Sequence, residues 1–458
     1  MRFLCHLRIS TLIITIGALF IFVFLFQLLL EFNYIKEDST SEKTGPINHV
    51  LMNSKMNEVK HPVILWWTPF TGEGYVLKTC RDKKCFFTED RTFQSHPLIK
   101  AMMFYGSKFD VMDLPLPRNG SRIHWALLHE ESPKNTPVLS HAAALRLFNF
   151  TSTFSRHSHS PLTLQYLRDA DILRDMKYFV PTETKNRLLQ ELAPVAYIQS
   201  DCSTPLERDA YVTELMKYIP VDSYGSCIQN KKLPPSLANP LESMDSDEFF
   251  HFVARYKFTL AFENAVCEDY ITEKLWRPLI VGSVPVYMGS PSVKDWLPNN
   301  SSAIIAADFK SPQDLAEYLL SINKDDNMYN SFLQHKLSSH DRKITNTRLL
   351  SALQSRTWGV DNDLSKINMV EYFECFVCQR VNNEHTFPSV ANISHYDCPR
   401  PLSPLTGLEN PENWWVDQWH TGNCEAEVLK YFVDTRRNTY SSDEFYEEVK
   451  RLLFEGKC

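Results

Sequence analysis

Short apolar runs recur between residues 63 and 306, each bounded by polar or turn-forming residues. They are rich in β-branched and aromatic residues and show little alternation, which is typical of strands buried on both faces of a parallel sheet. The runs predicted as strands are Val63–Trp67, Ala101–Tyr105, Ile123–Leu128, Val195–Ile198, Phe258–Phe262, Val284–Met288 and Ala303–Ala306.

Helical patterns separate several of these runs. The predicted helices are Arg208–Tyr218, Tyr270–Val281 and Pro312–Ser321, and Ser311 with Pro312 gives the last one an N-cap and a proline at its first position. Alternating strands and helices predict an α/β fold with mainly parallel sheets.

The pattern divides into two α/β domains, residues 61–185 and 186–360, which we expect to face a cleft. After residue 361 the pattern changes to an extension, residues 361–458, that is punctuated by cysteines and tryptophans. A final helix is predicted to start at Ser441, with Glu444 completing a capping box.

The pattern at the N-terminus predicts a membrane anchor. Residues 1–8 form a short basic tail, residues 9–30 form an uncharged apolar span of roughly 30 Å, and residues 31–60 form a polar stem. Basic residues before the span predict a cytosolic N-terminus. The alternative is a cleaved signal peptide, but the apolar run is long and no clear small-residue cleavage site follows it. We expect a single-pass type II protein of the endoplasmic reticulum or Golgi membrane, with its bulk in the lumen.

Cysteines and glycosylation motifs agree with a lumenal compartment. Eleven cysteines occur, and only Cys5 lies on the cytosolic side, which leaves an even number in an oxidising lumen. A net charge of −7 argues against nucleic acid as the main partner. The candidate glycosylation sites are Asn119, Asn149, Asn299, Asn300 and Asn392.

The segment from Phe262 to Trp276 carries the strongest chemical pattern. An apolar strand leads to Glu263 and Asn264, and a helix-like segment follows. On a helix, residues three and four apart share a face. The stripe formed in this way is Tyr270, Glu273, Lys274 and Arg277. These groups suit a sugar nucleotide, since carboxylates accept from sugar hydroxyls and cations hold a diphosphate. The alternative is an exposed helix with ordinary ion pairs.

This segment resembles the donor-binding signature of glycosyltransferase family 10, the α-1,3-fucosyltransferases, and the likeness covers about Pro62 to Cys378. It implies the arrangement of two Rossmann-like domains called GT-B and GDP-fucose as donor. With Arg208 and Lys274 available for the diphosphate, we expect that no metal or other cofactor is required. In this chain it implies that Arg208 and Lys274 meet phosphate and that Glu273 meets ribose or fucose hydroxyls. The residues implied to bind the donor are Ser200, Arg208, Asn264, Tyr270, Glu273 and Lys274.

The resemblance also implies a catalytic base. The family places it at the Glu immediately before Ser-Pro, which is Glu131, just after the predicted strand Ile123–Leu128. By position alone, a solvated loop acid is the alternative. Glu130, His124 and His129 are the other candidates for the base.

The cysteine pair Cys375 and Cys378 has three interpretations: a zinc site, a redox pair, or structural disulfides. The resemblance implies disulfides to Cys80 and Cys85, and Cys202 with Cys227 is the next expected pair. The pairing of Cys267, Cys398, Cys424 and Cys458 stays open. Three Asp-x-Asp patterns, which begin at Asp169, Asp245 and Asp361, look like solvated segments rather than metal sites.

One block departs from the family. Many relatives read Tyr-Arg-Arg-Asp-Ser-Asp where this chain reads Phe154-Ser-Arg-His-Ser-His159. Residues His129–Pro133, Thr153–His159 and Glu263–Glu273, with Cys267, resemble the divergent protein O-fucosyltransferase 3 and 4 branch, whose members modify Ser or Thr of EMI modules. The resemblance therefore implies an inverting transfer of fucose to protein hydroxyls. The alternatives are α-1,3-fucosyl transfer to N-acetylglucosamine of N-glycans, an inverting glycosidase, and a lumenal lectin or chaperone without enzymatic activity.

Overall fold

A computed structural model describes residues 58–118, 123–337, 344–360, 363, 365–383 and 389–458. Residues 60–458 form one compact unit. The predicted tail and anchor, and nearly all of the predicted stem, lie outside the described residues. In the described ranges, no helix is long and apolar enough to cross a membrane.

The first sheet has six strands in the order β2-β3-β1-β4-β5-β6. All neighbours are parallel except β2 and β3, which form an antiparallel hairpin at the edge. The strands are β1 (Val63–Trp66), β2 (Tyr75–Cys80), β3 (Lys83–Thr88), β4 (Ile99–Tyr105), β5 (His124–His129) and β6 (Phe150–Thr153). Each residue of β1 is buried, as the continuous apolar run predicts.

The second sheet is wholly parallel and has the order β11-β10-β9-β7-β8. Its strands are β7 (Val195–Gln199), β8 (Val221–Gly225), β9 (Phe258–Phe262), β10 (Val284–Met288) and β11 (Ile304–Ile305). The chain moves outward in opposite directions from β7 and β9, and such a switch point opens a crevice at the carboxyl ends of the strands. A small pair, β12 (Trp358–Gly359) and β13 (Ile367–Asn368), completes the described strands. The prediction of an α/β fold with parallel sheets is confirmed.

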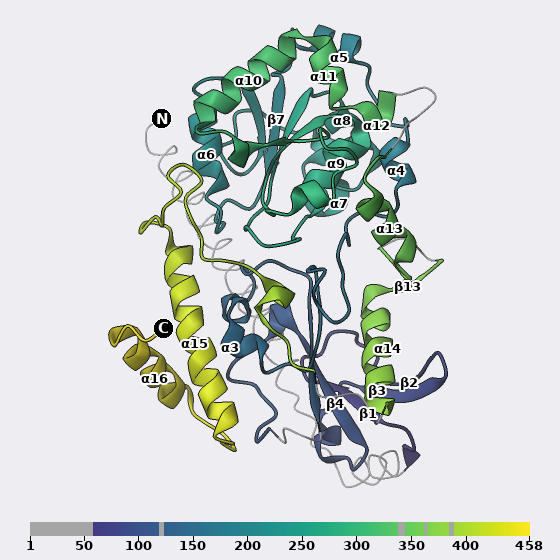
Figure 1. The fold of residues 1–458 in the computed structure, drawn as a ribbon, viewed down its shortest axis with the longest axis vertical. Coiled ribbons are helices and arrows are strands. Elements are labelled where there is room, and N and C mark those ends of the chain that lie inside the picture. Colours follow the sequence, from purple (N-terminus) through teal and green to yellow (C-terminus); the bar gives the residue numbers. More distant parts are fainter. Residues whose placement is uncertain (1–57, 119–122, 338–343, 361–362, 364, 384–388) are drawn as a thin grey trace, which may run out of the picture. The chain divides into compact units, whose positions relative to one another are not determined.

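Figure 1 shows the two sheets in separate lobes, with helices packed around each. The helices between the first and second sheets and around the second sheet are α4 (Asp171–Arg174), α5 (Thr182–Leu188), α6 (Arg208–Leu215), α7 (Pro240–Ser243), α8 (Asp247–Ala254), α9 (Glu273–Val281), α10 (Pro312–Lys324), α11 (Asp326–Ser331), α12 (Gln334–Leu337) and α13 (Thr347–Ser355). The others are α3 (Ala142–Leu145), α14 (Met369–Asn382), α15 (Trp414–Asp434) and α16 (Ser442–Phe454). Ser441 caps α16 in a capping box with Glu444, as predicted.

The chain joins the second lobe before residue 186. Leu164, Leu167 and Leu173 are buried in one cluster with Trp276 of α9. Conversely, α14 returns to the first sheet, where Glu374 accepts from the indole nitrogen of Trp66 at 2.8 Å. The segment after residue 361 is therefore partly built into the first lobe rather than appended to it.

Five disulfides hold these segments together. Cys80–Cys375 and Cys85–Cys378 join the β2–β3 hairpin to α14, and Cys202–Cys227 joins the loops after β7 and β8. These are the pairs expected from the sequence. The pairs left open there are Cys267–Cys398 and Cys424–Cys458.

Replacing Cys85 and Cys378 by Ser together should lower the free energy of unfolding by about 2–5 kcal/mol, because their disulfide closes a long loop of the unfolded chain. The sequence separation of this pair is 293 residues. Thermal unfolding of the purified protein measures the loss, and peptide mapping without reductant tests the pairing. Free thiols at both positions, or stoichiometric zinc, would contradict it.

Two of the expected glycosylation sites are buried in the folded chain. Asn149 is 5% exposed and Asn299 is 8% exposed, which is unfavourable for a glycan at either side chain. The side chain of Asn149 instead donates to the carbonyl of Ser389 at 3.0 Å. Asn300 and Asn392 are exposed and remain predictions, while Asn119 lies outside the described residues.

Candidate active site

The candidate residues lie on three loops, each at the carboxyl end of a buried strand. Glu131 follows β5 of the first sheet, whereas Ser200 and Arg208 follow β7 of the second. The third loop runs from Glu263, after β9, to Lys274 in the first turn of α9. Strands β7 and β9 flank the switch point, where ligands of open α/β sheets bind.

A buried carboxylate organises the loop after β9. Glu263 is wholly buried and accepts from the main-chain nitrogen of Thr272 at 2.8 Å and from its hydroxyl at 2.7 Å. Thr272 is the N-cap of α9, so the helix begins at Glu273. The predicted start at Tyr270 is therefore wrong, because this cap ends the extended loop only at Thr272. Tyr270 lies before the helix and does not share its stripe.

Lys274 lies among carboxylates and is charged. Its Nζ is 3.1 Å from Glu273 and 3.8 Å from Glu263. Burial lowers the pKa of Lys274, but these two carboxylates outweigh burial and raise it above its ordinary value. Burial likewise opposes ionisation of Glu273, yet Lys274 and Arg277 lower its pKa to about 2. Glu263 differs, since burial raises its pKa to about 7 despite Lys274.

Arg208 supplies a second cation close to Lys274. Its side chain is 1% exposed, and it donates to the carbonyls of Phe262 at 3.1 Å and Asp201 at 2.6 Å. Its Nε has no partner among the described residues. The charge of Arg208 acts to lower the pKa of Lys274, against the effect of the carboxylates. Together with the amino end of α9, the two cations can receive an anion such as a diphosphate.

Two further candidates flank these cations. Asn264 is half-buried, and its Oδ1 has no hydrogen-bond partner among the described residues. Its main-chain carbonyl accepts from Leu206 at 3.2 Å, which ties the loops after β7 and β9 together. Ser200 is exposed at the end of β7, and its carbonyl accepts from the hydroxyl of Ser226 at 2.8 Å.

Glu131 faces these residues from the first lobe. Burial raises the pKa of its carboxyl group, as do Glu130 and Glu273, while Lys274 opposes the shift. Glu131 in turn raises the pKa of Tyr270, together with the stronger effect of burial. The loops of the two lobes also meet directly, in an ion pair between Lys134 and Asp201. The carboxylate is thus within electrostatic reach of the second lobe's cations.

The other candidates for a base are less suited. His129 is wholly buried, and burial lowers its pKa to about 3. His124 begins β5 and so lies at the opposite end of the strand from the loop of Glu131. Glu130 is 8% exposed and accepts from the hydroxyl of Tyr105 at 2.8 Å.

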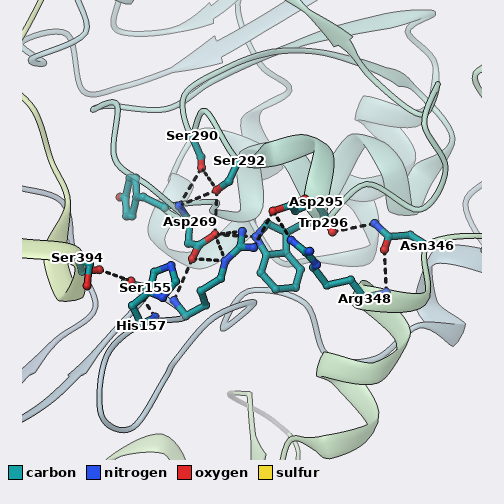
Figure 2. A network of polar contacts seen from close by, with 12 residues as sticks. Ser155, His157, Asp269, Ser290, Ser292, Asp295, Trp296, Asn346, Arg348 and Ser394 are labelled. Atoms are coloured by element: carbon teal, nitrogen blue, oxygen red, sulfur yellow. Dashed lines mark hydrogen bonds and ion pairs between the residues drawn. The ribbon is translucent and has the colours of Figure 1, made fainter.

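A network around Asp269 was not predicted from the sequence. Arg156, from the loop after β6, donates from its main chain to Asp269 at 2.9 Å and from its Nε at 2.8 Å. Figure 2 shows Asp269 also surrounded by Ser290, Ser292 and Trp296. Through Arg156, the network holds Asp269, the residue before Tyr270, against the first lobe. Arg156 and Asp269 are 113 positions apart, and no local pattern indicates their pairing.

Among the described residues, no group of potential metal ligands gathers at this cluster. In the part of the chain that the structure describes, one group of three candidate ligands lies close together, Cys202, Asp209 and Cys227. Its two cysteines form a disulfide and therefore offer no thiolate. Of the Asp-x-Asp patterns, Asp169 is paired with Arg168 and Asp247 with Lys177, while Asp361 lies outside the described residues.

Two family models match most of the chain. Residues 59–177 match "Fucosyltransferase, N-terminal", and residues 188–396 match "Glycosyltransferase family 10 (fucosyltransferase) C-term". A crystal structure of an alpha1,3-fucosyltransferase with GDP-fucose is 16% identical and covers 67% of this chain and 83% of that one, with a TM-score of 0.38.

Curated relatives are much more similar. GDP-fucose protein O-fucosyltransferase 3 of Mus musculus is 47% identical over 412 residues, which cover 86% of this chain and 84% of the relative. The protein of the same name from Xenopus laevis is 44% identical over 448 residues, which cover 93% of this chain and 94% of the relative. The chain therefore belongs to glycosyltransferase family 10, the fucosyltransferases.

Proposed function

We propose that this chain transfers fucose from GDP-fucose to Ser or Thr hydroxyls of folded lumenal proteins, with EMI modules as acceptors, and inverts the configuration at the sugar. The observation that carries the proposal is the cluster built from both lobes, in which Glu131 lies within electrostatic reach of Lys274 and Glu273, and Lys134 of the same loop forms an ion pair with Asp201 of the second lobe. Family membership and the names of its relatives support the donor and the protein acceptor.

Each candidate has a role in such a transfer. Glu131 takes the proton of the acceptor hydroxyl as that oxygen bonds to fucose C1, while the bond from C1 to the diphosphate oxygen breaks. Arg208 and Lys274 stabilise the negative charge that develops on the departing GDP. Glu273 accepts from ribose or fucose hydroxyls, and Asn264, Tyr270 and Ser200 complete the donor site. The two lobes correspond to a GT-B enzyme.

The acceptor part of the proposal is supported by the segment that departs from the family. Ser155 donates to the carbonyl of Ser394 at 2.7 Å, and His159 contacts the hydroxyl of Ser389. Arg156 forms an ion pair with Asp269. Where many relatives carry two acids and a tyrosine, this chain uses the segment to hold its own C-terminal part. Such a change is expected to alter the acceptor.

Membrane anchoring is a further part of the proposal. The uncharged run of residues 9–30 would hold the enzyme in the endoplasmic reticulum or Golgi membrane, with residues 60–458 in the lumen. Five disulfides in the described residues suit that oxidising compartment.

The test is a transfer assay with GDP-fucose that compares a folded EMI module with an N-glycan acceptor. Fucose should appear on Ser or Thr of the module, and mass spectrometry locates it. Transfer to N-acetylglucosamine of the glycan instead would make this an α-1,3-fucosyltransferase. Sugar release without a donor would indicate a glycosidase, and binding without turnover would indicate a lectin or chaperone.

Chelation should leave the rate nearly unchanged, because Arg208 and Lys274 supply the positive charge that a divalent metal would otherwise place at the diphosphate. The assay is repeated after dialysis against EDTA and again with added Mn²⁺. Activity lost to EDTA and restored by Mn²⁺ would show that the two side chains do not replace a metal.

A further inference from the structure

The hydroxyl of Tyr396 connects two residues of the loop that carries Glu131. It lies 2.7 Å from the main-chain oxygen of Glu131 and 3.0 Å from Nε2 of His129. A carbonyl oxygen only accepts, so the tyrosine hydroxyl donates to Glu131. The tyrosine oxygen then accepts from His129, which must carry its proton on Nε2. Burial lowers the pKa of His129 to about 3, so this histidine stays neutral. In that state its Nε2–H donates to the tyrosine oxygen.

The next two residues bind the loop after β9. The main-chain oxygen of Asp397 accepts from Glu268 at 2.9 Å. Cys398 forms a disulfide with Cys267, only three positions after Asn264. Residues 396–398 therefore connect the loop of Glu131, in the first lobe, to the loop that carries the second lobe's candidate residues.

The ring of Tyr396 is held independently of its hydroxyl. It is fully buried, stacked on His129 with 4.9 Å between ring centroids, and 5.0 Å from Phe154. Phe154 in turn packs on Tyr270 at 5.0 Å. Removing the hydroxyl alone would keep these ring contacts, so the hydrogen bond to Glu131 can be tested separately from packing.

We propose that Tyr396 is a positioning residue for the transfer reaction, and that its hydroxyl holds the main chain of Glu131 where the carboxylate faces Lys274. This inference rests on the proposed function, in which Glu131 is the base. Proton transfer from the acceptor requires the base within hydrogen-bond reach, and a displacement of about 1 Å can cost up to ~100-fold in rate. Tyr396 touches neither the sugar nor the acceptor in this role.

Tyr396→Phe should lower kcat about 10-fold or more, with KM and Kd for GDP-fucose within about twofold of the wild type. The reason is that the donor residues of the second lobe stay in place while the base loop loses its hydrogen bond. Steady-state transfer gives kcat and KM, and calorimetry with GDP-fucose gives Kd. An unchanged kcat would overturn the inference.

Tyr329→Phe is the matched control. Tyr329 is also fully buried, donates to the main-chain oxygen of Lys257 at 2.9 Å, and lies 3.3 Å from the Nζ of Lys185. It packs in the second lobe, in a hydrophobic cluster that includes Phe258 and Leu260 of β9 and does not include Tyr396. A similar fall in kcat for both variants would show a general effect of losing a buried hydroxyl.

The decisive measurement combines Tyr396→Phe with Glu131→Gln. If Tyr396 acts through the carboxylate of Glu131, its hydroxyl should matter little once that carboxylate is gone. The double variant should therefore transfer fucose at a rate within about twofold of the rate of Glu131→Gln alone. Radiolabelled donor and long incubation measure that rate. An equal fold-loss in both backgrounds would overturn the inference.

Two controls separate the possible failures. A wild-type protein that transfers no fucose would contradict the proposed function itself, whereas an active wild type with an equally active Tyr396→Phe contradicts only the role of Tyr396. If Tyr396→Phe does not fold, Cys267→Ala with Cys398→Ala tests the same connection from its other end. That pair should also lower kcat, and an unchanged kcat would count against the inference.

Discussion

Glu131→Gln should reduce the rate of fucosyl transfer by about 10²–10⁴ while leaving GDP-fucose affinity almost intact. A hydroxyl is a poor nucleophile at neutral pH, and loss of general-base help costs a rate factor of that size. Glutamine keeps the size and hydrogen bonding of the side chain but cannot accept the proton. Because the expected donor contacts come from the second lobe, calorimetry should give a Kd for GDP-fucose within a few-fold of the wild type.

Glu130→Gln is the matched control. Glu130 is the neighbouring acid but accepts from the hydroxyl of Tyr105, so this change should have a much smaller effect on the rate. If Glu130→Gln shows the large loss of rate and Glu131→Gln the small one, Glu130 is the base. If Glu131→Gln retains transfer within a few-fold of the wild type, Glu131 is excluded from that role.

The pH dependence gives a second check on the same residue. A base works only when deprotonated, so kcat should fall as pH drops through the pKa of Glu131. Burial, Glu130 and Glu273 raise that pKa above the ordinary value of a glutamate, and Lys274 opposes them. The acidic limb of the kcat profile should therefore lie at higher pH than for an exposed carboxylate. The limb should be lost in Glu131→Gln.

The strands that the sequence predicts correctly are continuous apolar runs buried on both faces. β9 and β10 are examples, since all five residues of each are buried. The missed strands lack that pattern. β2 is an edge strand in which only Cys80 is buried, and β6 buries Thr151, Ser152 and Thr153. The hydroxyls of Thr151 and Thr153 contact His395, which lies more than two hundred positions away and which a local pattern cannot indicate.

The candidate site shows the same limit. The residues of the loop after β9 were named because they resemble a family signature, yet the start of α9 was misjudged. Its true start depends on Glu263, which contacts Thr272 nine positions later. The pairing of Asp269 with Arg156, the role of Tyr396 and the partner of Cys398 were not predicted, because each of these contacts joins residues more than a hundred positions apart. Such contacts exist only once the two lobes and the C-terminal part have assembled.

The second large effect is expected on the affinity for GDP-fucose, when a cation of the site is removed. Lys274→Gln should weaken GDP-fucose binding by about 1.5–3 kcal/mol, because hydrogen bonds to charged groups contribute that much when partly desolvated. That loss corresponds to a Kd roughly 10- to 150-fold higher. Binding of GDP alone should weaken by a similar factor, since the contact is expected at the diphosphate. Calorimetry with both ligands measures the change.

The variant should remain folded, because the carboxylates around Lys274 can adjust. Glu263 already has a pKa raised to about 7 by burial, so it can take up a proton once the neighbouring ammonium is gone. Lys294→Gln is the control of equal charge change. Lys294 is exposed and paired with Asp308 at 2.9 Å, and its loss should leave Kd for GDP-fucose unchanged. If both lysine variants weaken binding equally, the effect comes from net charge. If Lys274→Gln binds GDP as the wild type does, then Lys274 does not hold the diphosphate, and Arg208 remains the cation to be tested there.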